Sequence, residues 1–270
     1  MFLCVWPHVS WSQDEIEIKF LNEYAIHLAG PYGEVKYLLT ALPSTTNKDS
    51  LRAIIKKELL KYPKGVLTKK ARLKKILVVD RLGEIAGDSV HHQALGTYCV
   101  PVASGNIVIV SGTAPIMSAA IHHEISSIFL EELSIKDPLY EQKAISLLRR
   151  FQELTQYIYK DPELSAVLEA KHEWPRNKNN FFVLGNSGYG LVDYENDYNT
   201  IVEFLFTPKL SKELGTMLVD PTLTLWEFLS EAKRGNYAVY EKVMLVINYY
   251  NSIDPHFTET YFRKFEDQPR

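Results

Sequence analysis

One stretch of the sequence gathers histidine and glutamate side chains that could carry out hydrolytic chemistry. Residues 121–132 read IHHEISSIFLEE. In a helix of pattern H-E-x-x-H, two histidines one turn apart hold one zinc ion, and the glutamate activates the metal-bound water as a general base. His123 and Glu124 supply the first two positions of this pattern, but the fifth position is Ser127, whose hydroxyl is a poor zinc ligand. Taken alone, the stretch therefore does not complete the zinc pattern.

Other histidines could complete such a site. His122 is a possible substitute ligand, but neighbouring residues on a helix point about 100° apart. His122 and His123 therefore cannot both reach one ion without distortion. His91 and His92, which we expect in a loop, could also approach, although nothing in the sequence places them there.

The elements that must position these residues change character along the chain. The first half predicts a helix over 51–60, a buried strand over 74–80 and a hairpin of strands 97–102 and 106–110. A helix over 116–133 follows, which we call the histidine helix because it carries His122 and His123. The second half predicts mainly helices, over 138–159, 162–171, 195–206, 208–217, 223–233, 236–250 and 257–265. Strands followed by helices predict an α+β fold. We expect a small mixed or antiparallel sheet with an active-site helix, followed by a mainly helical C-terminal lobe.

In the order of these pieces, the chain resembles the zinc-binding metallopeptidases of the gluzincin type, found among bacterial secreted proteins and surface lipoproteins. The matching pieces are His122-His123-Glu124, Ser187-Gly188-Tyr189, and Asp197-Tyr198-Asn199 with Glu203, over roughly residues 50–210. The resemblance implies a zincin-like fold in which His123 and Glu203 are zinc ligands and Glu124 is the general base. It also implies that Tyr189 donates a hydrogen bond to a tetrahedral oxyanion. The chain departs from the family pattern at Ser127, where the second ligand histidine is expected.

The function implied by this resemblance is a zinc-dependent, metallopeptidase-like hydrolase that acts on peptide or protein through an atypical or weakened metal site. An alternative is a non-catalytic binding protein, a pseudoenzyme on the same scaffold that holds a peptide or protein partner. A third possibility is an intracellular interaction protein without an ancestral enzyme site. Metal content of the purified protein separates the first two hypotheses.

Composition narrows the class of protein. The chain has 270 residues, of which 46% are hydrophobic and 23% charged, and its net charge is −3. These values exclude a disordered or low-complexity chain, and we expect no nucleic-acid partner because a basic field over the whole protein is absent. The two cysteines match no zinc or redox motif. No segment approaches the ~18–20 uninterrupted apolar residues of a membrane span.

The N-terminus differs from the rest of the chain. Residues 1–13, MFLCVWPHVSWSQ, carry no Lys, Arg, Asp or Glu and resemble the back half of a secretory signal peptide without its basic region. We therefore expect a truncated signal peptide on a secreted, periplasmic or cell-surface protein, with a cytoplasmic protein as the alternative. The remainder, 14–270, is expected to be one zincin-like domain, with an α+β lobe over about 14–135 and a helical lobe over about 136–270.

Overall fold

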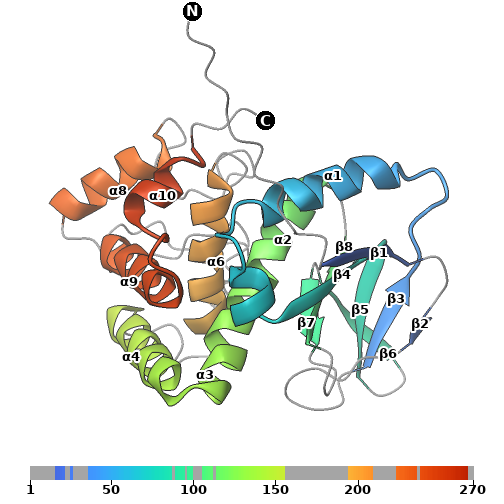
Figure 1. The fold of residues 1–270 in the computed structure, drawn as a ribbon, viewed down its shortest axis with the longest axis horizontal. Helices are drawn as coiled ribbons and strands as arrows, with labels where there is room; N and C mark the ends of the chain where they lie inside the picture. The colour runs from blue at the N-terminus through green and yellow to red at the C-terminus, as the bar shows by residue number, and fades with distance from the viewer. Residues whose placement is uncertain are drawn as a thin grey trace, which may run out of the picture.

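The structure is a computed structural model. It describes residues 16–21, 25–26, 36–86, 89–94, 96–99, 105–111, 114–155, 194–208, 223–235 and 238–266. These residues form a mixed α+β fold in which two small sheets lie to one side of a layered group of helices (Figure 1), so the predicted α+β class is confirmed. Segment 1–13, the expected helix 162–171 and Tyr189 lie outside the described residues.

The first sheet is mixed and lies against the helices. In spatial order its strands are β1 (Glu17–Phe20), β4 (Leu73–Val79), β8 (Asn106–Ser111) and β7 (Gly96–Cys99). The first three strands are parallel, and β7 pairs antiparallel with β8, as the predicted hairpin requires. Side chains of β4 alternate between two buried clusters: Ile76 and Val78 join the helices, whereas Leu77 and Val79 join the second sheet. Both faces of β4 are covered, which explains its apolar sequence.

The second sheet is antiparallel, and the sequence did not predict it. Its strands, in spatial order, are β2 (Ala25–Ile26), β3 (Lys36–Thr40), β5 (Arg81–Ala86) and β6 (Ser89–Ala94). The prediction that His91 and His92 lie in a loop is wrong, because both belong to β6, where His92 is opposite Glu84. Strand β6 reads SVHHQA and lacks an apolar stripe, so pairing with β5, rather than a hydrophobic pattern, makes it a strand.

Helices supply most of the core. Their bounds are α1 (Lys48–Leu59), η1 (Val66–Lys70), α2 (Ala114–Ser127), η2 (Ile128–Glu132), α3 (Leu133–Lys136), α4 (Pro138–Thr155), α6 (Tyr194–Phe206), α8 (Leu225–Arg234), α9 (Ala238–Ile253) and α10 (Glu259–Arg263). Helix α1 begins after Asn47, whose side chain accepts a hydrogen bond from the Ser50 backbone. The helix therefore begins at Lys48, earlier than the predicted start at residue 51. None of the helices within the described ranges is both long and apolar enough to cross a membrane.

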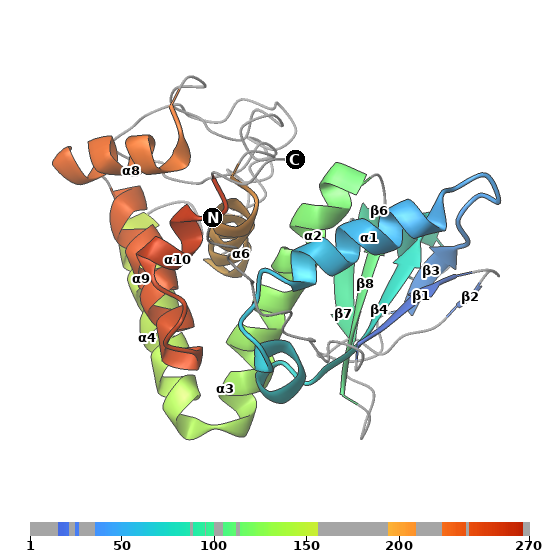
Figure 2. The same cartoon turned by 45° about the horizontal axis from the view of Figure 1, so that its top comes forward.

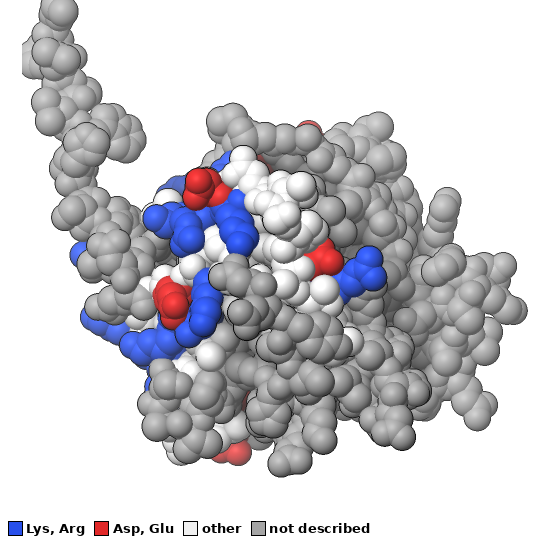
Figure 3. Space-filling view, turned by 90° about the vertical axis from the view of Figure 1, so that its right-hand side faces the viewer, with Lys and Arg blue, Asp and Glu red and all other residues white. Residues whose placement is uncertain are grey.

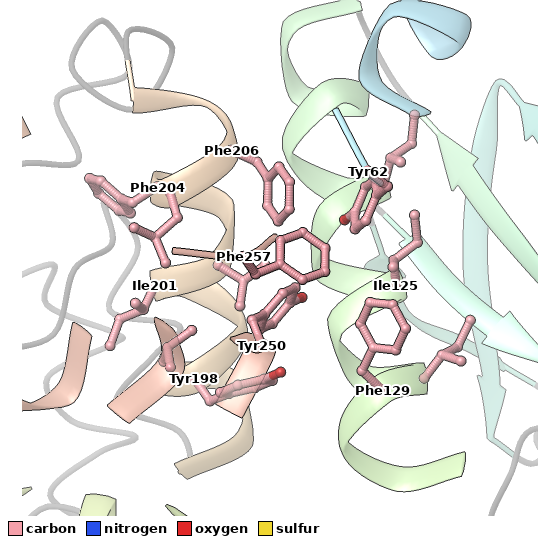
Figure 4. Close-up of a cluster of buried hydrophobic side chains, with 14 of the residues drawn as sticks. Tyr62, Ile125, Phe129, Tyr198, Ile201, Phe204, Phe206, Tyr250 and Phe257 are labelled. Carbon is pink, nitrogen blue, oxygen red and sulfur yellow. The ribbon is translucent and has the colours of Figure 1, made fainter. Parts of the chain in front are cut away.

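Helix α2 runs between the first sheet and the other helices, with α6 at its side (Figures 1 and 2). It is buried on nearly all sides, which agrees with its apolar sequence. Figure 4 shows the aromatic cluster that joins α2 and α6 to the C-terminal helices. Phe206 of α6 is central to it: its ring centroid lies 4.6 Å from that of Tyr62 and 6.3 Å from that of Phe257. The core thus holds the histidine helix in a fixed position beside α6.

The two edges of the first sheet differ in charge. At β1, Arg52 of α1 donates a hydrogen bond to the Ile18 carbonyl, and Lys75 forms an ion pair with Glu17 at 2.9 Å. Figure 3 shows lysine and arginine side chains, interspersed with acidic ones, on the face of the molecule that lies to the right in Figure 1. Such charges protect an edge strand from pairing with another chain. Among the described strands, the opposite edge of this sheet is β7, which reads GTYC and carries no charged residue.

Candidate functional site

The structure brings together two of the residues expected in a metal site. Nδ1 of His123, on α2, lies 2.6 Å from Oε1 of Glu203, on α6. Both side chains are largely buried, with 12% and 24% of their surfaces exposed. The expected proximity of His123 and Glu203 is therefore present, as an ion pair between the two helices.

A second polar contact lies one helical turn away. The Asn199 amide, on α6, donates a hydrogen bond to Ser127 Oγ at 2.8 Å and lies 3.3 Å from His123 Nε2. Its oxygen also accepts a hydrogen bond from Ser126. Positions 123 and 127 share one face of α2, and positions 199 and 203 share one face of α6, because residues four apart are neighbours on a helix. We call these four side chains — His123, Ser127, Asn199 and Glu203 — the polar ladder.

Glu124 lies on the sheet side of α2, against β7. Only 8% of this residue is exposed. A Cβ atom added at Gly96 of β7 would lie 2.7 Å from Glu124 Oε1 and 3.0 Å from its Cγ, so the carboxylate packs directly on the strand backbone. Glycine at position 96 thus permits the close approach of the β7 backbone to the Glu124 side chain.

The charged forms of these groups depend on burial and on one another. Burial alone would lower the pKa of His123, but the hydrogen bond and negative charge of Glu203 outweigh it and raise that pKa to about 9. Burial raises the pKa of Glu124 to about 7, with His123 opposing the rise and Glu195 and Glu203 adding to it.

Substitution of Gly96 tests the packing of Glu124. Gly96→Ala is expected to lower the free energy of unfolding by about 1–3 kcal/mol, because the new methyl group overlaps a buried side chain. The measurement is urea unfolding of the four proteins of a double-mutant cycle: wild type, Gly96→Ala, Glu124→Ala and the double variant. The loss caused by Gly96→Ala should be smaller when Glu124 is already alanine. An equal loss in both backgrounds would show that Glu124 does not pack on Gly96.

His122 lies in a separate buried cluster. Its Nε2 is 2.7 Å from Oε2 of Glu58, and its Nδ1 is 2.9 Å from the hydroxyl of Tyr62. Lys61 pairs with the same carboxylate oxygen at 2.5 Å, and the imidazole stacks on Phe206. Burial lowers the pKa of His122 to about 4, against the pull of Glu58, so the ring is neutral: Nε2–H donates to Glu58, and Nδ1 accepts from Tyr62. Both nitrogens have hydrogen-bond partners, so the ring would have to leave Glu58 or Tyr62 to bind a metal ion.

The described residues do not fit a zinc site. Zinc in proteins takes Cys, His or carboxylate ligands at ~2.0–2.3 Å, three of them at a catalytic centre. Within the described ranges, no three His, Cys, Asp or Glu side chains are grouped so that they could hold a metal ion. His123 and Glu203 supply two ligand groups, while Ser127 and Asn199 occupy the rest of the shared face.

Comparison with known proteins finds no relative. No family model, no curated protein and no solved structure matches this chain.

Two polar features of the structure were not predicted. Asn199 was noted only as part of a matching sequence, yet it lies one turn before Glu203, and this spacing could have indicated that both face α2. The second feature is an ion pair between Asp197 of α6 and Lys242 of α9, whose side chains are 0% and 1% exposed. No sequence signal could pair these residues, because their elements meet only in the tertiary structure.

Proposed function

We propose that this protein binds peptide or protein segments beside α2, on a metallopeptidase-like scaffold that does not rely on a complete zinc centre. The observation that carries the proposal is the pairing of Ser127 with Asn199 in the place where a second ligand histidine is expected. With a hydroxyl at that position, the helix carries the His123 and Glu124 of the expected pattern but offers zinc one imidazole fewer.

Strand β7 suggests how such a segment could bind. It is the last strand of its sheet in the part of the chain that is described, it lies beside α2, and it has no charged side chain to oppose pairing. An extended peptide can add to an exposed sheet edge, where main-chain hydrogen bonds supply affinity. The packing of Glu124 on Gly96 places a carboxylate directly beneath that strand.

A weak zinc-dependent hydrolase is the second candidate, and one observation favours it. Glu124 has a pKa of about 7, close to the value that suits a general base at neutral pH. Because the described residues do not complete a zinc site, we derive no catalytic step for it. The two candidate functions differ in whether the peptide is only bound or is hydrolysed.

Hydrogen exchange tests the binding proposal. We expect a casein-derived peptide mixture, added in the presence of a chelator, to slow amide exchange in β7. Strand β1, the charge-protected edge of the same sheet, serves as the internal control and should be unchanged. Unaltered exchange in β7, or equal protection of β7 and β1, would contradict strand addition. Zinc-stimulated cleavage of the peptides that is lost in Glu124→Gln would favour the hydrolase instead.

A further inference from the structure

The polar ladder has a feature that the peptide-binding proposal does not use: the Asn199 amide nitrogen contacts both the His123 ring and the Ser127 hydroxyl. A zinc ion held by position 123 would lie ~2.0–2.1 Å from a ring nitrogen. Nδ1 of His123 is already 2.6 Å from Glu203, and Nε2 is 3.3 Å from the amide nitrogen of Asn199. An ion on Nε2 would therefore compete with Asn199 for the same space.

The same amide also occupies the second ligand position. Asn199 donates to Ser127 at 2.8 Å, and its oxygen contacts the Ser126 hydroxyl. The single proton of that hydroxyl goes either to the Asn199 oxygen or to the His123 carbonyl, which is 2.7 Å away. Asn199 is fully buried, as are both serines apart from 4% of Ser127. An asparagine side chain can donate two hydrogen bonds and accept two, so it satisfies several buried polar groups that a metal ion would otherwise join.

We propose that Asn199 acts as a built-in substitute for the metal ion: its amide bridges His123 and Ser127 and keeps zinc out. The site thus carries two changes from a zinc site, the missing histidine at 127 and the amide inserted at 199. Restoring the histidine alone leaves the amide in place, and removing the amide alone leaves only two ligands. Both changes must be reversed before zinc can bind tightly.

Zinc titration by calorimetry tests this proposal on the full chain. Wild type, Ser127→His and Asn199→Ala are each expected to bind zinc weakly. The double variant Ser127→His/Asn199→Ala should bind at least tenfold more tightly than any of them, because His123 Nε2 and the new imidazole can then share one ion, with Glu203 as third ligand once its carboxylate turns from Nδ1 to the ion. The matched control is Ser127→His/Asn251→Ala, which removes an exposed asparagine on α9 and should behave like Ser127→His alone.

Two results would overturn the proposal. Tight zinc binding by Ser127→His alone would show that Asn199 does not exclude the ion, and weak binding by a folded double variant would show that the two helix faces do not form a latent site. Circular dichroism establishes folding, and Asn199→Ser, which keeps a polar group, replaces Asn199→Ala if the alanine variant does not fold. The ladder contacts are internal to the chain, so neither result bears on strand addition at β7.

Discussion

Lys242→Met is expected to lower the free energy of unfolding by about 3–5 kcal/mol, the usual effect of removing one partner from a buried ion pair. The ammonium group of Lys242 is paired with Asp197, and the two side chains are 1% and 0% exposed. Lys242 also lies over the ring of Phe151, with its nitrogen 5.5 Å from the centroid. Methionine would fill similar space but would remove the positive charge that pairs with the buried Asp197 carboxylate. Urea unfolding at pH 7 measures the loss.

The double variant Asp197→Leu/Lys242→Met separates loss of the pair from loss of packing. Replacing both charges by apolar groups of similar volume is often close to neutral, so the double variant should be markedly more stable than Lys242→Met alone. Arg150→Met is the surface control: its partners Glu153 and Glu241 are about half exposed, and its loss should stay below ~1 kcal/mol. A loss in Lys242→Met as small as that of Arg150→Met would mean that the pair is hydrated in solution.

The second prediction concerns pH and His122. Burial lowers the pKa of this ring from 6.5 to about 4 in the folded protein. The unfolded chain therefore binds more protons between these values, so the contribution of His122 to stability is fully present above pH 6.5 and is lost as pH falls toward 4. At 1.36 kcal/mol per pKa unit, the loss is about 3 kcal/mol. The measurement is urea unfolding of wild type and His122→Gln at pH 7 and at pH 4. The loss is the change between the two pH values in the difference between their free energies of unfolding.

The pH dependence of stability must be compared between variants, because protonation of Glu124 changes stability in the opposite direction to protonation of His122. Its folded pKa is raised to about 7, so the folded protein takes up a proton there first and gains stability as pH falls from 7 toward 4.5. His122→Gln should therefore gain stability relative to wild type on acidification, whereas Glu124→Gln should lose it. His256→Ala, at a site whose side chain is 74% exposed, should follow wild type. If the free energies of unfolding of wild type and His122→Gln changed with pH in parallel, the burial of a neutral imidazole would be contradicted.

Most elements with a strong local pattern could be predicted from the sequence. The apolar runs of β4 and β8 and the turn before β8 indicated strands, and the helical periodicity around α2 and α9 indicated buried helices. The second sheet could not be predicted in this way. Its strands have mixed polarity, and they are held by pairing across the chain and by contacts such as that of Leu82 with the cluster on the far face of β4.

The candidate site, like the fold, could be predicted from the sequence only in part. The sequence by itself determined that His123 and Glu124 lie on a buried helix and that Ser127 replaces the second histidine of the zinc pattern, because helical spacing fixes which residues share a face. Only the tertiary structure decided their partners. Because α6 packs against α2, His123 contacts Glu203 and Ser127 contacts Asn199. Because α1 and the residues just after it pack against α2, His122 contacts Glu58 and Tyr62. The neighbouring histidines thus have opposite pKa shifts, although each ring contacts a carboxylate. Burial outweighs Glu58 at His122, where Lys61 adds a positive charge, whereas Glu203 outweighs burial at His123.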